Sequence, residues 1–93
     1  MRTDWTPPAV ADLDHLVRNI AKDNIDAALR TEDRVMAAVA RLERYPASGR
    51  MGALRHTREL VVVQTPYVVI YRVAEEALEI LRVIHGAQNW PPT

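Results

Sequence analysis

The apolar residues of this chain change their spacing once, at Pro46. Before it they recur at steps of three and four, which is typical of helices with one buried face. After it, short runs rich in Val, Ile, Leu and Tyr alternate with turn residues, which is typical of strands. A chain of 93 residues is enough for one domain and not two. We therefore expect a single domain at 1–93, built from helices followed by a sheet.

Residues 7 to 45 are predicted to form a helical hairpin. Thr6 and Pro7 mark its start, because threonine caps exposed amides and proline suits the first helical position. Asn24 breaks the pattern and caps a second helix, and Pro46 prevents that helix from continuing past Tyr45. The side chains expected to be buried are Val10, Leu13, Val17, Ile20, Leu29, Met36, Val39 and Leu42.

The predicted order of elements is β-α-α-β-β-β. A brief first strand covers residues 2 to 6, and a loop rich in Gly and Ser covers 47 to 52. The remaining strands are expected at 57 to 64, 67 to 73 and 77 to 85, joined by turns short enough for hairpins. Strands linked in this way pair antiparallel. The predicted fold class is therefore α+β, with the helical hairpin packed on a small antiparallel sheet to which the first strand adds.

Both faces of the predicted sheet are apolar. Along the last strand, Leu78, Ile80 and Ile84 alternate with Leu81 and Val83. A sheet with one wet face alternates apolar and polar residues more cleanly, and two helices cover only one face. The apolar side chains that the helices leave uncovered favour a partner on the second face, or in the groove where the hairpin meets the sheet edge. The alternative is that the loop at 47 to 56 and the C-terminal tail fold over that face.

The charge is balanced, with 12 basic and 12 acidic side chains, and the sequence has no cysteine. The lack of cysteine excludes disulfides and fits a reducing compartment. The N-terminus does not read as a signal peptide, and no apolar run is long enough to span a bilayer, so a cytoplasmic protein is expected. Without a basic surplus, nucleic acid is not expected as the main ligand. His15, His56 and His85 are dispersed, so we expect no metal and no cofactor.

Three segments of the second half, at 57–62, 66–73 and 80–91, resemble the C-terminal half of the RelE/ParE toxins in the same order. Trp5-Thr6, Asp12-Leu13 and the break at Asn24 resemble the N-terminal half. Pro46 followed by 49–52 is similar to the loop that leads from the helices to the sheet. Where the family often has glycine before Thr-Arg-Glu-Leu, this chain has a histidine at 56. The resemblance covers nearly the whole chain.

This resemblance implies the toxin half of a type II toxin–antitoxin pair, of the kind that serves plasmid stabilisation. Such a toxin is neutralised by a cognate antitoxin, which places a helix and an extended segment over it. ParE-like members inhibit DNA gyrase and have no known hydrolytic site, whereas RelE-like members cut mRNA on the ribosome. We favour gyrase here, because there is no basic surplus and the sole lysine, Lys22, lies outside the sheet. A non-toxic module that only binds an antitoxin is a further alternative.

Ribonuclease activity would need a base, an acid and cations for the phosphorane. The residues that could supply them are Arg58, Tyr67, Tyr71, Arg72, Arg82 and His85. Regular alternation places Arg82 on the face of Ile80 and Ile84, and His85 on the opposite face. Arg72 and Arg82 could form a small cationic site or pair with nearby glutamates. The tyrosines are expected to pack with their hydroxyls in water, and His85 could equally be a strand-end histidine without a catalytic role.

Overall fold

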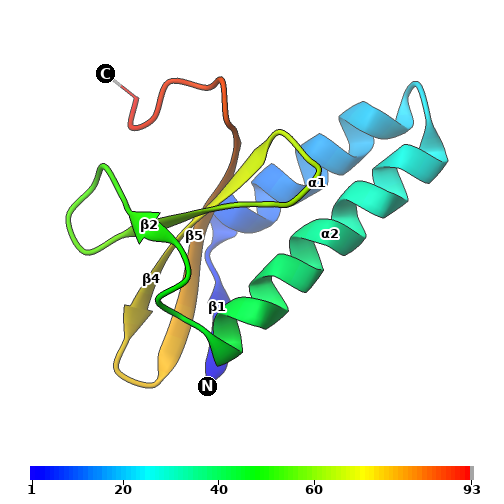
Figure 1. Ribbon diagram of the computed structural model, residues 1–93. Helices are drawn as coiled ribbons and strands as arrows, with labels where there is room; N and C mark the ends of the chain where they lie inside the picture. Colours follow the sequence, from blue (N-terminus) through cyan, green and yellow to red (C-terminus); the bar gives the residue numbers. More distant parts are fainter. Residues whose placement is uncertain (93) are drawn as a thin grey trace.

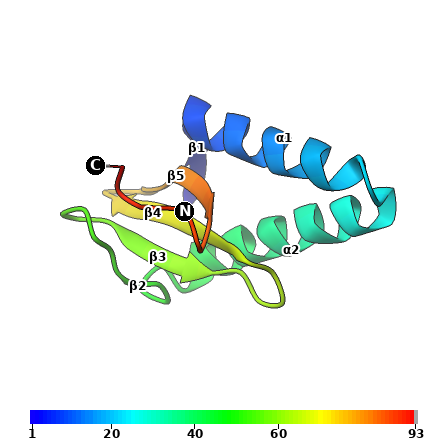
Figure 2. The ribbon, with the colours of Figure 1, turned by 90° about the horizontal axis from the view of Figure 1, so that it is seen from above.

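The computed structural model describes residues 1–92. Its elements are β1 (Arg2–Trp5), α1 (Pro7–Ala21), α2 (Ile25–Arg44), β2 (Arg50–Met51), β3 (Arg58–Val61), β4 (Tyr67–Ala74) and β5 (Ala77–His85). Figure 1 shows α1 and α2 as a hairpin packed on the sheet, and the view from above in Figure 2 separates the helical layer from the strands. The predicted α+β fold is confirmed.

The strands form one sheet in the order β1-β5-β4-β3-β2. The hairpin-linked strands β3, β4 and β5 are antiparallel, as predicted, whereas β1 joins the sheet parallel to β5. One strand was not predicted, and one predicted strand ends earlier than expected. The expected loop at 47–52 contains β2, whose two residues pair with the start of β3, and β3 ends at Val61 rather than at 64.

Both predicted helix caps are confirmed. The Thr6 hydroxyl accepts a hydrogen bond from the Ala9 amide at 3.2 Å, and the Asn24 side chain accepts one from the Ala27 amide at 2.9 Å. These bonds satisfy amides that have no partner within the helix. The Thr6 hydroxyl also donates to the Leu81 carbonyl at 2.9 Å, so the start of α1 is fixed to β5.

The buried faces of the helices lie about 100° away from three of the predicted positions. Val39 and Leu42 are buried as expected, and Leu13, Val17 and Ile20 are half-buried. Val10, Leu29 and Met36 are exposed, and the prediction for these three is wrong. Each follows a buried residue by one position, and one position turns a helix by about 100°. The buried neighbours are Ala9, Ala28 and Val35.

A bulge in β5 alters the expected alternation of its side chains. Ile70 of β4 pairs with Arg82, but the next residue, Tyr71, pairs with Ile80, so Leu81 has no partner in β4. An extra residue of this kind shifts the side chains beyond it to the other face. Consequently Ile80 and Val83 lie in the main core under the helices, and the prediction that Ile80 and Ile84 share a face is wrong.

The second face of the sheet is covered by the C-terminal segment. Val68, Ile70 and Ile84 form a small cluster there, and Trp90 packs against it. All three cluster residues are at most 7% exposed. The apolar surface that favoured a partner on this face is therefore buried within the chain, and folding over of the tail is the alternative that the structure bears out.

His56 stands at a left-handed backbone position, with φ of 63°. Glycine adopts such a conformation without strain, whereas a residue with a Cβ atom is disfavoured there by about 1–2 kcal/mol. The turn before β3 therefore has the backbone for which glycine is the ordinary choice, although this chain has histidine.

Candidate functional site

The structure brings four of the six ribonuclease candidates together in two separate pairs, Tyr67 with His85 and Arg58 with Tyr71. The rings of Tyr67, at the start of β4, and His85, at the end of β5, meet edge-to-face with their centroids 5.6 Å apart. The two residues are direct partners in the β4–β5 register. His85 also lies on the face of Val83, as predicted, because both follow the bulge. Tyr67 and His85 therefore place a phenol and an imidazole side by side, the groups that a shared proton-transfer role needs.

The arginines are each engaged elsewhere. Arg72 pairs with Glu79 across the β4–β5 ladder, so it does not join Arg82 in a cationic site. It lies five residues along β4 from Tyr67, which corresponds to about 16 Å. Arg58 donates to the Gly49 carbonyl at 2.9 Å and thereby holds the loop before β2. These positions do not surround one phosphate, so the constellation that RNA cleavage needs is not assembled.

Arg82 is held by Asp12, a residue that the sequence did not single out as functional. The Asp12 carboxylate accepts hydrogen bonds from Arg82 Nε at 2.6 Å, from Arg82 Nη2 at 2.9 Å and from the Val83 amide at 2.9 Å. This bidentate bond raises the pKa of Arg82 above its usual value. The guanidinium also lies 5.4 Å from the centre of the Trp90 ring. We call this arrangement the Asp12 clamp; it joins α1, the β5 bulge and the C-terminal segment.

Tyr71 is a structural residue whose hydroxyl is not in water, contrary to the prediction. Its side chain is fully buried, and the hydroxyl donates to the Pro46 carbonyl at 2.7 Å and accepts from the Gly49 amide at 2.8 Å. A Cβ atom on Gly49 would lie 2.6 Å from that hydroxyl, so only glycine fits here without displacement. Burial is the main cause that raises the pKa of Tyr71 above its usual value.

We expect Tyr71→Phe to lower the free energy of unfolding by about 1–3 kcal/mol, because it leaves the part-buried Pro46 carbonyl and the buried Gly49 amide without this partner. The exposed Tyr45→Phe is the matched control and is expected to change stability by less than about 0.5 kcal/mol. Urea unfolding measures both. Because the folded pKa is raised, the contribution of Tyr71 is present below the unfolded pKa and is lost as the pH rises through the folded pKa. An equal loss of unfolding free energy in both variants would show that the buried Tyr71 hydroxyl contributes no more to stability than an exposed one.

A groove runs between α2 and the β3 side of the sheet. It has a volume of about 390 Å³, and we call it the α2–β3 groove. Its lining comprises Arg34, Ala37, Ala38, Arg41, Leu42, Ser48, Leu60, Val61 and Val63. Val61 and Val63 are 54% and 66% exposed, which makes one wall both apolar and accessible. This is the second location in which the sequence placed a partner, where the hairpin meets the sheet edge.

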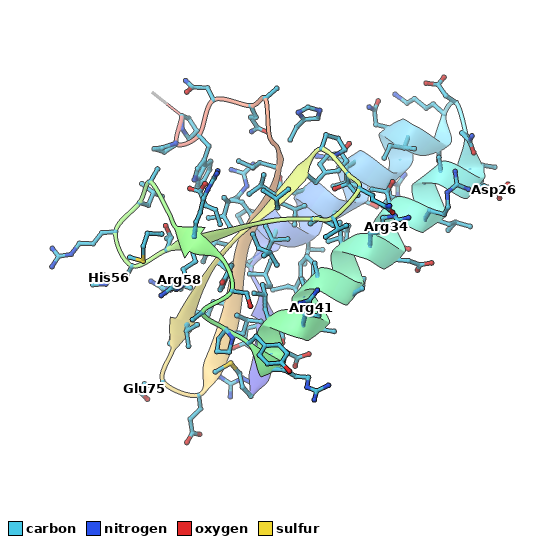
Figure 3. The ribbon with its side chains drawn as sticks, viewed as in Figure 1. Asp26, Arg34, Arg41, His56, Arg58 and Glu75 are labelled. Atoms are coloured by element: carbon cyan, nitrogen blue, oxygen red, sulfur yellow. The ribbon has the colours of Figure 1, made fainter. Side chains whose placement is uncertain are left out.

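The α2–β3 groove has a positive rim and an open strand edge. Arg34 and Arg41 are two turns apart on one side of α2, as Figure 3 shows, and the lining contains no carboxylate. Neither arginine forms an ion pair with any residue in the range 1–92. Because β2 pairs only with Arg58 and Glu59, the outer edge of β3 beyond Glu59 has no neighbouring strand in the described structure. The i, i+3, i+4, i+7 spacing of the basic and small residues on α2 was a sequence signal for this face.

No group of three or more His, Asp or Glu side chains gathers in residues 1–92 as a metal site would require. In the same residues, no helix is both long and apolar enough to cross a membrane.

Comparison with known proteins identifies relatives over almost the full chain. The family model described as "ParE toxin of type II toxin-antitoxin system, parDE" matches residues 3–90. Y4kP of Sinorhizobium fredii, which is named as a candidate toxin, is 46% identical over 90 residues, covering 97% of this chain and 93% of Y4kP. Toxin RelE2 of Caulobacter vibrioides is 40% identical over 84 residues, covering 90% of this chain and 93% of RelE2.

The fold comparison agrees with the sequence comparisons. A chain from the chromosomal ParDE TA system of P. aeruginosa matches with a TM-score of 0.83 and 25% identity, covering 91% of this chain and 95% of that chain. The resemblance to RelE/ParE toxins is thereby confirmed over residues 3–90. The chain belongs to the ParE toxin family of type II toxin–antitoxin systems.

Proposed function

We propose that this toxin inhibits DNA gyrase in the cytoplasm and is neutralised by a cognate antitoxin. The observation that carries the choice of gyrase is the separation of Arg58, Arg72 and Arg82, each held in its own structural contact. RNA cleavage needs charge stabilisers and acid–base groups around one phosphate. Inhibition by binding needs a surface and no such constellation. The surfaces proposed for gyrase are the segment 82–90 and the helical hairpin.

The antitoxin is proposed to lie along the α2–β3 groove. The exposed valines offer an apolar seat, and the open edge of β3 offers backbone groups to an added strand. The rim contains Arg34 and Arg41 without a carboxylate, which favours an acidic segment on the partner. An extended stretch with alternating apolar and acidic residues meets all three requirements.

The purified toxin is expected to block supercoiling by gyrase and to leave mRNA in translating ribosomes uncut. Both assays are run on one preparation, with the antitoxin complex as the control that restores supercoiling. Cleavage at the ribosomal A site with gyrase unaffected would overturn the proposal and favour the RelE-like alternative. In that event Arg82→Ala and His85→Ala should each lower the cleavage rate about a hundredfold or more.

The Tyr67–His85 contact is the one observation that favours the ribonuclease alternative, since it places a phenol beside an imidazole. A third alternative, a non-toxic module that only binds an antitoxin, is tested by induced expression. Growth arrest that the antitoxin relieves supports an active toxin, and normal growth with a folded, soluble protein supports the non-toxic module.

A further inference from the structure

A second groove lies between α1 and the sheet, where β4 begins and β5 ends. Its volume is about 630 Å³, and we call it the α1–β5 groove. Helix α1 contributes His15, Arg18 and Asn19 to its lining, and the C-cap of the helix contributes Lys22. Because these residues are three and four positions apart, they share one face of the helix. The sheet side contributes the Tyr67–His85 ring pair described above.

The polar groups of this groove are mainly hydrogen-bond donors. Its one carboxylate, Asp12, already accepts three hydrogen bonds within the Asp12 clamp. Arg18 pairs with Asp14 on the same helix. Lys22, by contrast, has no carboxylate partner anywhere in residues 1–92. The groove therefore offers a cation and several donors to a ligand that brings acceptors and negative charge.

The ring pair adds an aromatic surface with a defined donor. His85 Nδ1 accepts a hydrogen bond from the Ala87 amide at 3.0 Å, so the neutral ring carries its proton on Nε2. The His85 side chain is exposed, and its ring stands at 79° to that of Tyr67. Flat aromatic groups beside cationic donors are the combination on which nucleic-acid bases stack while their phosphates are bound.

We propose that the α1–β5 groove binds a nucleoside phosphate. The base lies against the Tyr67–His85 pair, and the phosphate is bound by Lys22 with donors of α1. The groove volume falls within the roughly 300–1,000 Å³ of small-molecule sites. A free mononucleotide and one nucleotide of a single strand present the same chemistry. No cleavage accompanies binding, because Arg58 and Arg72 are held elsewhere, and the assignment stands independently of gyrase inhibition.

The sole lysine of the chain makes this proposal directly testable. Reductive methylation with ¹³C-formaldehyde labels Lys22 and the Met1 amine and keeps their positive charge. Met1 lies beside Glu75 and Glu76 in a different hollow, so it serves as an internal control; Figure 1 places the N-terminus far from the α1–α2 turn. The labelled full chain is titrated with AMP, adenosine, inorganic phosphate and a hexadeoxyadenylate strand, and NMR follows the methyl signals.

We expect the Lys22 signal to shift with saturation by AMP, while the Met1 signal stays in place. Adenosine and inorganic phosphate should each need about tenfold higher concentration, because each lacks half of the contacts. His85→Ala should weaken AMP binding about tenfold, since it removes one of the rings against which the base stacks. His56→Ala, which changes an exposed histidine outside the groove, is the matched control and should leave binding unchanged.

The other results of the titration distinguish a free nucleotide from a nucleotide within a strand, and show when the proposed site is wrong. Tighter binding of the hexanucleotide than of AMP identifies a nucleotide of a strand as the ligand, and the reverse identifies a free nucleotide. Equal binding of phosphate and AMP would overturn the nucleoside assignment in favour of a simple anion site. Absence of a Lys22 shift up to about 10 mM AMP, or equal shifts of Lys22 and Met1, would overturn the site altogether. A toxin that still blocks gyrase in that case leaves the proposed function standing.

Discussion

Replacing Asp12 with alanine is expected to lower the free energy of unfolding by about 3 kcal/mol. The substitution removes all three hydrogen bonds of the Asp12 clamp and leaves the Arg82 guanidinium and the Val83 amide without their acceptor. Removing one partner of a buried ion pair costs about 3–5 kcal/mol. We expect the lower end because the side chains of Arg82 and Asp12 are still 28% and 15% exposed.

Thermal unfolding monitored by circular dichroism measures this effect. For a domain of this size, a loss of 3 kcal/mol corresponds to a fall in Tm of about 12–24 °C. Asp14→Ala is the matched control, because Asp14 is two residues away on the same helix and pairs with Arg18 at the surface. Exposed pairs contribute about 0–1 kcal/mol, so the control should lower Tm by only a few degrees. Similar falls in both variants would contradict the role assigned to the clamp.

The Asp12 clamp also changes how an Arg82 variant is interpreted. Arg82→Ala leaves the Asp12 carboxylate half-buried without its cation and removes the group beneath Trp90. Loss of toxicity in that variant is therefore expected to accompany loss of stability. A ribonuclease role would require an activity loss in a variant whose Tm is unchanged.

Reversing the charge of both arginines at the rim of the α2–β3 groove is expected to weaken antitoxin binding about a hundredfold. Arg34→Glu with Arg41→Glu places two carboxylates where the proposed partner brings its own acidic residues, and like charges at an interface cost several kcal/mol. A hundredfold rise in Kd corresponds to about 2.7 kcal/mol. Both side chains are exposed and unpaired within residues 1–92, so the fold should be retained.

Titration calorimetry with the cognate antitoxin measures the affinity, and raised salt should narrow the difference from the unmodified toxin. The double variant Arg30→Glu with Arg55→Glu is the control, because it makes the same change in net charge at exposed positions outside the groove lining. A similar loss of affinity in the control would assign the effect to total charge. Undiminished binding in Arg34→Glu/Arg41→Glu would exclude the groove as the antitoxin site.

Local signals in the sequence were sufficient for the order of the elements except the two-residue strand β2. Thr6 and Asn24 act as caps because their side chains reach amides only three residues away, and Pro46 stops α2 because proline has no amide to continue it. Alternating apolar runs with short turns define β4 and β5, because this signal too is contained within a few residues. The family resemblance rests on these ordered segments, and it holds over nearly the whole domain.

The burial pattern was only partly accessible from the sequence. Their large apolar side chains suggested Leu29 and Met36 as core residues, but the buried residues are Ala28 and Val35 on the adjoining face. The depth of a contact between layers depends on which neighbours approach it. A periodicity that gives equal weight to two adjoining faces cannot supply that information.

The arrangement of the functional groups was decided by tertiary contacts. The bulge at Leu81 changed which side chains of β5 share a face, and it is visible only in the pairing with β4. Asp12 meets Arg82 across 70 residues of sequence, so no local pattern connects them. Sequence determines what each short segment favours, because caps, turns and periodicity act within a few residues. Which arginine is a structural partner and which lines an open groove depends on the register and packing of distant segments.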